Sequence, residues 1–112
     1  MSSTATKLLG LLLVVLAFAV AATADECDGD RQDMIRECKK YESFPAEPKI
    51  PPSEACCAVW QRANIPCLCR GVTKEKEKVW CMEKVVYVAK YCNKPFQPGY
   101  QCGSYTVPPL AQ

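Results

Sequence analysis

Four cysteines lie close together near the middle of the chain, as Cys56-Cys57 and Cys67-Leu68-Cys69. Adjacent cysteines seldom bond to each other, because the short ring that would form is strained. The side chains of Cys67 and Cys69 do not point the same way either. Each of the four is therefore expected to reach a different part of the chain, so that the cluster ties distant segments together. The remaining cysteines are Cys27, Cys38, Cys81, Cys92 and Cys102.

Whether these thiols are oxidised depends on the compartment, and residues 1–24 bear on this. Lys7 is their only charge, and it precedes an apolar run over residues 8–21 that is short for a membrane span, which needs about 20 apolar residues. The run ends in Ala22-Thr23-Ala24, a small-x-small pattern that signal peptidase accepts, with Asp25 next. We expect a signal peptide at 1–24 and one secreted, soluble domain at 25–112; a retained membrane anchor is the alternative.

Nine cysteines in a secreted chain of this size are typical of a disulfide scaffold. The sequence has no His and no C-x-x-C pair, so we predict no metal site and no cofactor. Without His, a Ser-His or Cys-His catalytic pair cannot be built, and the Asp and Glu residues lie in polar, lysine-rich stretches. We therefore predict that the protein is not an enzyme. A net charge of +2 gives no indication of nucleic-acid binding.

The hydrophobic pattern predicts four helices. The first is expected over 29–41, followed by a proline-rich loop over 42–52. Ser53 is a suitable N-cap for a second helix that ends near residue 63, with Asn64 as its stop. A short third helix is expected between Pro66 and Gly71. Thr73 is expected to cap the fourth and longest helix.

The fourth helix carries most of the regular apolar spacing. Val79, Met82, Val86 and Ala89 follow one another at 3-4-3 intervals, which places them on one face, with Cys81 off that face. This face is expected to be either an ordinary core surface or the wall of a ligand site. From residue 93 onward, prolines and glycines exclude a long helix, so we expect an irregular tail that packs across the surface and is pinned by Cys102.

With Cys81 left out, the cysteines follow the order C-x10-C-x17-CC-x9-CxC-x22-C-x9-C. This framework resembles that of the plant non-specific lipid-transfer proteins, within the superfamily that also holds amylase/trypsin inhibitors and 2S albumins. The short spacing between CC and CxC is more similar to the small and divergent types than to type 1. The resemblance implies an all-α, four-helix, disulfide-stapled bundle around an internal apolar cavity that is closed by an irregular C-terminal tail.

The same resemblance implies an extracellular carrier, in the apoplast or cell wall, that binds fatty acids or phospholipids and contacts membranes transiently. Burial of an acyl chain stabilises the complex by about 0.8 kcal/mol per CH₂, so no specific polar contact is needed. Two residues near the CxC motif and in the tail are candidates for meeting a lipid head group, Arg70 and Tyr105. The candidates for the cavity wall are Met34, Ile35, Val59, Leu68, Val79, Met82, Val85, Val86, Ala89, Tyr105 and Val107.

The resemblance also implies a pairing of the cysteines. In the family, an apolar residue inside CxC, here Leu68, accompanies the type 2 pattern. Eight cysteines allow 105 pairings, so the assignment depends on the resemblance. The alternative exchanges two partners, to Cys27–Cys69 and Cys67–Cys102. The type 2 pattern corresponds to Cys27–Cys67, Cys38–Cys56, Cys57–Cys92 and Cys69–Cys102.

Two features leave alternatives open. Cys81 has no place in the eight-cysteine pattern; we favour a monomer with a free thiol over a dimer linked through it. Another function class is inhibition of digestive enzymes, for which Lys49-Ile50 in the proline-rich loop is the candidate contact. A third is a plant defence protein that acts on microbial membranes, which the near-neutral charge does not favour.

Overall fold

The structure is a computed structural model that describes residues 26–109. The expected signal peptide lies outside the described residues. Within 26–109, no helix combines the length and the hydrophobicity needed to cross a membrane. The elements, in chain order, are α2 (Asp28–Glu42), α3 (Glu54–Arg62), α4 (Ile65–Arg70), the 3₁₀ turn η1 (Lys76–Lys78), α5 (Met82–Tyr91), β1 (Gln101–Cys102) and β2 (Tyr105–Thr106).

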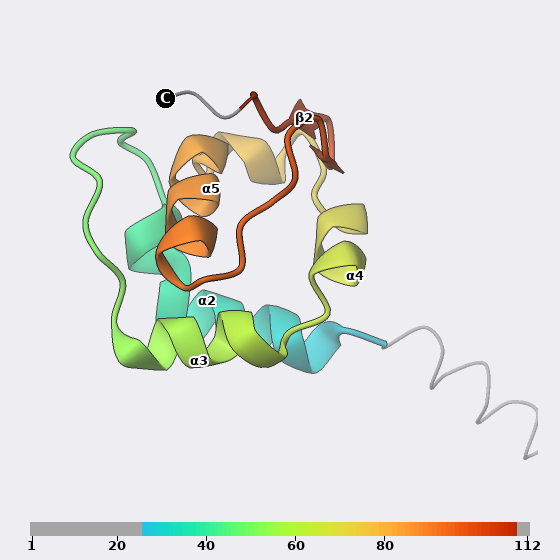
Figure 1. Ribbon diagram of the computed structural model, residues 1–112. Helices are drawn as coiled ribbons and strands as arrows, with labels where there is room; N and C mark the ends of the chain where they lie inside the picture. Colours follow the sequence, from blue (N-terminus) through green and yellow to red (C-terminus); the bar gives the residue numbers. More distant parts are fainter. Residues whose placement is uncertain (1–25, 110–112) are drawn as a thin grey trace, which may run out of the picture.

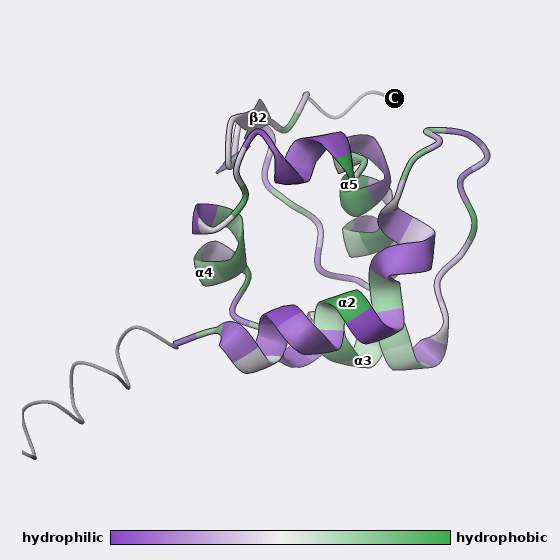
Figure 2. Ribbon diagram, turned by 180° about the vertical axis from the view of Figure 1, so that it is seen from behind, coloured by the Kyte–Doolittle hydropathy of each residue, from purple (hydrophilic) through white to green (hydrophobic). Residues whose placement is uncertain are grey.

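The helices are arranged around a common centre (Figure 1). Helices α2 and α3 lie side by side and α5 packs against both of them, while α4 lies on the other side of the molecule and contacts β1. Figure 2 shows that α2 is largely hydrophilic along its length, whereas α5 carries several hydrophobic residues. On α2 the buried apolar side chains are Met34 and Cys38, one turn apart, so the helix presents a narrow apolar stripe to its neighbours.

Local capping explains where the middle helices begin. The Ser53 side chain accepts a hydrogen bond from the backbone N–H of Cys56 and starts α3 as predicted. Asn64 was predicted to stop α3, but its side chain accepts a hydrogen bond from the backbone N–H of Cys67 and so caps the start of α4. Gly71 ends α4 as expected.

The prediction of one long fourth helix is wrong. The side chain of Thr73 does accept a bond from the Lys76 N–H, but only the short turn η1 follows, and α5 begins at Met82. Between them, Trp80 forms an isolated antiparallel bridge with Ser43, and the Cys81 N–H donates to the Glu42 carbonyl at 2.7 Å. This pairing with the end of α2 satisfies the backbone in an extended form, so a tertiary contact overrides the helical pattern.

The C-terminal tail is irregular as predicted, except for a small hairpin that the sequence analysis missed. Strands β1 and β2 pair antiparallel, with Cys102 opposite Tyr105. Before the hairpin, Phe96 packs edge-on against Trp60 of α3, with ring centroids 5.9 Å apart. The tail therefore crosses the bundle and contacts its interior.

Gly103 turns the hairpin in a position that no other residue fits. Its φ is +64°, and a Cβ atom there would lie 2.6 Å from the Val72 carbonyl oxygen and 2.8 Å from the Val72 side chain. We expect Gly103→Ala to reduce the free energy of unfolding by about 2 kcal/mol, through left-handed strain and overpacking together. Denaturant unfolding measures this. Gly29→Ala in α2 is the control, because a Cβ there has nothing within 4 Å, and it should be neutral or stabilising; equal losses would contradict the argument.

Four disulfides join the elements, and they are the pairs that the type 2 pattern implies. The structure contains Cys27–Cys67, Cys38–Cys56, Cys57–Cys92 and Cys69–Cys102. The first two tie α2 to α4 and α3, the third ties α3 to the end of α5, and the fourth ties α4 to the hairpin. Cys81 is the free cysteine of the described residues, and it is buried at 2% exposure, where it packs as a small apolar side chain.

Candidate functional site: an apolar cavity among the helices

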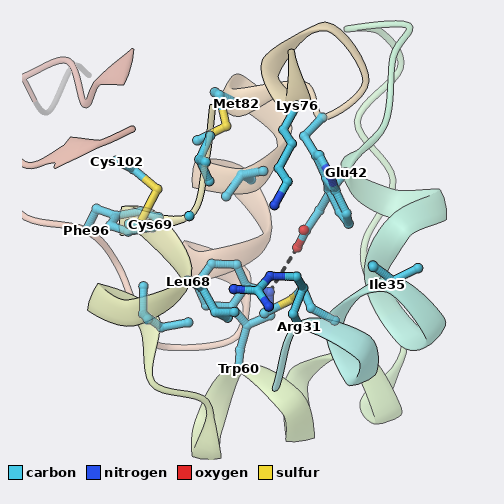
Figure 3. A pocket seen from close by; sticks show the side chains of 16 residues that line it. Arg31, Ile35, Glu42, Trp60, Leu68, Cys69, Lys76, Met82, Phe96 and Cys102 are labelled. Atoms are coloured by element: carbon cyan, nitrogen blue, oxygen red, sulfur yellow. Dashed lines mark hydrogen bonds between the residues drawn. A yellow bond between two sulfur atoms is a disulfide. The ribbon is translucent and has the colours of Figure 1, made fainter. Parts of the chain in front are cut away.

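An apolar cavity lies between the helices and opens to solvent. Its empty volume is about 690 Å³ when the space at the open mouth is counted. Helices α2, α3, α4 and α5 contribute to its wall, as do η1 and the tail, and most of the lining is apolar. Figure 3 shows the lining side chains converging from these elements. They are Arg31, Met34, Ile35, Glu42, Trp60, Ile65, Leu68, Cys69, Gly71, Val72, Lys76, Trp80, Met82, Val85, Phe96 and Cys102.

Five of the predicted wall residues line this cavity. Met34 and Ile35 reach it from α2, Leu68 from α4, and Met82 and Val85 from the first turn of α5. The disulfide cysteines Cys69 and Cys102 lie in the same wall, so the Cys69–Cys102 bond holds part of it in place.

Six predicted wall residues lie outside the cavity, for different reasons. Val59 and Ala89 are fully buried between the helices and serve as core. Val79 is 47% exposed, because the helix predicted to turn it inward does not form there. The remaining three face other surroundings: Val86 is half-buried on α5, Tyr105 lies in β2, and Val107 is buried where its backbone pairs with that of Tyr100.

The aromatic part of the wall was missed by the sequence analysis. Trp60, Trp80 and Phe96 come from α3, the bridge before α5 and the tail, which are distant in sequence. Aromatic residues scattered in this way have no shared periodicity, so helical spacing could not have found them. The one available signal was composition, since both tryptophans of the chain line the cavity.

The charged residues at the cavity differ from the predicted head-group pair. Arg70 is exposed and outside the cavity, whereas Arg31 lines it and its guanidinium lies over Gly71, where an added Cβ would be 3.2 Å from Nη2. Arg31 also pairs with Asp28 at 3.2 Å. Lys76 is exposed and lines the cavity as well, so Arg31 and Lys76 place positive charge at its open side.

Glu42, the last residue of α2, is a buried acidic group within this cavity. Its side chain is 1% exposed, and its Oε2 accepts a hydrogen bond from Trp60 Nε1 at 2.9 Å. Burial raises the pKa of the Glu42 carboxyl to about 8, because the charged form loses its hydration, and the bond from Trp60 offsets this only in part. The cavity therefore holds a neutral carboxyl at neutral pH.

Glu42 also belongs to a group of candidate metal ligands. Its carboxylate oxygen and the sulfurs of Cys38 and Cys56 lie within 4.8 Å of one another. The two sulfurs are bonded in a disulfide, so they are not thiolate ligands. This group is therefore not suited to binding a metal.

The proline-rich loop positions Lys49 with its charge already paired. Its Nζ bonds the carboxylate of Glu47 and lies 4.0 Å from that of Glu83, whereas Ile50 is exposed. A basic residue held in this way is a poor anchor for the acidic pocket of a trypsin-like enzyme, which must bind it without competition.

A helical domain held by four disulfides around an apolar cavity defines a class of small ligand-binding scaffolds. Residues 9–102 match the model of a protein family described as "probable lipid transfer". Because this match covers most of the chain, the protein belongs to this family. No curated protein and no solved structure matches the chain.

Proposed function

We propose that this protein is an extracellular carrier that binds the acyl chains of fatty acids or phospholipids in the cavity and transfers them between membranes or to the cell wall. The observation that carries the proposal is the apolar cavity lined by α2, α3, α4 and α5. A chain buried there gains about 0.8 kcal/mol for each CH₂ removed from water. Membership in a probable lipid-transfer family supports the same role.

The four disulfides support both the proposed lipid binding and the proposed extracellular location. Four covalent ties allow helices to stand around a hollow that a small uncrosslinked core would close. Disulfides persist in oxidising compartments, in agreement with a secreted protein. The buried free thiol of Cys81 is unavailable for an intermolecular bond, which favours a monomer.

The surface beside the mouth supports brief contact with a membrane. Ile35 and Val79 are 43% and 47% exposed and lie at a depression that adjoins the cavity through Ile35, Lys76 and Trp80. Two lysines, Lys39 and Lys76, and one acidic residue, Glu75, line the same depression. Exposed apolar side chains flanked by lysines suit an interface with lipid head groups. A lipid leaving a bilayer at this point would meet the open side of the cavity.

Displacement of a fluorescent fatty acid from the oxidised Asp25–Gln112 protein tests the proposal. We expect saturable binding that is lost when the disulfides are reduced. Absence of binding by the oxidised, helical protein would refute it. Assays of trypsin and amylase inhibition and of liposome leakage separate the carrier from an inhibitor or a membrane-active defence protein.

Filling the cavity should weaken ligand binding without unfolding the protein. Val85 lines the cavity and Val86, the next residue of α5, does not. We expect Val85→Phe to weaken fatty-acid affinity at least tenfold, because the added ring occupies ligand space, and Val86→Phe to leave affinity within about twofold. Titration with the fluorescent ligand measures both, and circular dichroism verifies folding. Equal effects of the two variants would show that the ligand lies elsewhere.

A further inference from the structure

Glu42 is a buried carboxylic acid in a cavity whose wall is mostly apolar. Arg31 and Lys76, the other charged residues of the wall, are partly or fully exposed, whereas Glu42 is buried. A buried carboxyl costs stability unless its polar atoms find partners, so a purely apolar ligand gains nothing from it. Figure 3 shows the carboxyl of Glu42 directed into the space between the lining side chains.

Glu42 is held at two points, one on its backbone and one on its carboxyl. The Glu42 backbone carbonyl accepts the Cys81 N–H, and Oε2 accepts the Trp60 indole N–H. Trp60 is itself 3% exposed and packs against Phe96. The hydrogen bonds of residues 26–109 include none to Oε1, yet no fully buried side-chain polar atom in that range lacks a partner, so Oε1 faces the open cavity.

The protonation state of the Glu42 carboxyl decides whether Oε1 can donate a hydrogen bond or only accept one. Charged groups facing the cavity from packed elements are Arg31 of α2 and Lys76 of η1, and no ion pair of the described residues includes Glu42. The nearby sulfurs of Cys38 and Cys56 do not titrate because they form a disulfide. Burial thus keeps the carboxyl neutral, and with Oε2 engaged by Trp60, Oε1 is free to carry an O–H donor into the cavity.

We propose that Glu42 and Trp60 form a polar subsite that binds an oxygen atom of the ligand, and so select acyl chains that bear a hydroxyl or oxo group. The inference deepens the proposed function and rests on it. A polar subsite in an apolar site discriminates because an unsubstituted chain leaves the carboxyl unpaired, whereas an oxygenated chain supplies its partner. We expect a preference of about tenfold for the oxygenated chain.

The test compares lysophosphatidylcholines with a plain stearoyl chain, a hydroxystearoyl chain and an oxostearoyl chain, with the oxygen placed mid-chain or near the methyl end. The phosphocholine head group, the ester and the glycerol hydroxyl are the same in all three probes, so a difference in affinity comes from the oxygen on the chain. Stearic acid is included to detect entry of a terminal carboxyl. Affinities are measured by displacement from the oxidised protein.

Variants at Glu42 distinguish a role in ligand recognition from a role in stabilising the fold. Glu42→Met removes both polar atoms at similar volume, so the variant should bind plain and oxygenated chains about equally well. Its affinity for the plain chain should be kept or improved. Glu42→Gln keeps an acceptor for Trp60 and a donor for the ligand, and should retain most of the preference. If Glu42→Met weakens plain and oxygenated chains equally, the role of Glu42 is structural and the inference is wrong.

The wild-type protein offers a second readout that needs no variant. An oxo group only accepts hydrogen bonds, so the preference for the oxostearoyl chain should fall as pH rises from about 6 to about 9.5 and Glu42 ionises. A hydroxyl group can donate to the carboxylate, so the preference for the hydroxystearoyl chain should be kept.

Equal binding of all chains at every pH would overturn the inference and leave the carrier proposal intact. Failure of every chain to bind would overturn the carrier proposal itself. Weakening of stearic acid alone by Glu42→Met would assign the subsite to a terminal carboxyl and contradict selection of oxygenated chains.

Discussion

The free energy of unfolding is expected to fall as pH rises from about 5 to about 8, and Glu42 is the cause. The pKa of Glu42 is raised to about 8 in the folded protein from its ordinary 4.5 in the unfolded chain. Between these values the folded state binds the additional proton, so its stabilising effect is complete below the unfolded pKa and is lost as pH rises through the folded pKa. The slope approaches about 1.4 kcal/mol per pH unit, which gives a loss of a few kcal/mol.

Denaturant unfolding of the oxidised protein at several pH values measures this slope, and Glu42→Gln is the control. The amide does not titrate and can still accept the bond from Trp60, so the variant should show a nearly flat profile over the same range. Asp33 titrates in a different window, because Arg62 and Arg36 hold the pKa of its carboxyl below the usual value and its effect appears only in acid. Parallel slopes in the two proteins would rule out Glu42 as the source.

Removal of the Cys57–Cys92 disulfide should have the other large effect. This bond joins α3 to the residue that ends α5, across a sequence separation of 35, so breaking it frees a long loop in the unfolded chain. We expect Cys57→Ala with Cys92→Ala to reduce the free energy of unfolding by about 2–5 kcal/mol. Loss of the tie should also let α5, which carries Met82 and Val85, move relative to α3, and so weaken fatty-acid binding.

Cys81→Ala is the matched control for the disulfide variant. It removes a buried cysteine that has no disulfide, so it loses only the packing of one sulfur atom and should cost about 1 kcal/mol. Thermal unfolding and ligand displacement on the three proteins measure the comparison. A disulfide variant as stable as the control would mean that the remaining three bonds suffice to hold the helices apart.

The family, the helical class and the cysteine framework were accessible from the sequence because they depend on local or strictly spaced signals. The caps at Ser53 and Gly71 act within one turn, so their positions predict where α3 starts and where α4 stops. The inward position of Leu68, taken from the resemblance, also agrees with the cavity wall. Helical spacing succeeded only in part on α5: Met82 lines the cavity as expected, Val86 and Ala89 of the same predicted face do not, and Val85, which that spacing did not include, does.

Tertiary structure decided what depends on contacts between distant segments. The bridge of Ser43 with Trp80 interrupts the expected fourth helix and leaves Val79 in solvent, because pairing with α2 satisfies the backbone as well as a helix would. The aromatic wall and the buried carboxyl arise in the same way. Glu42 was expected to begin the proline-rich loop, but it is the last residue of α2, and its burial against Trp60 keeps its carboxyl neutral. The sequence predicted the first three helices and the cysteine framework, because these depend on local signals, whereas packing between distant segments determined where the fourth helix begins and the chemistry of the space between the elements.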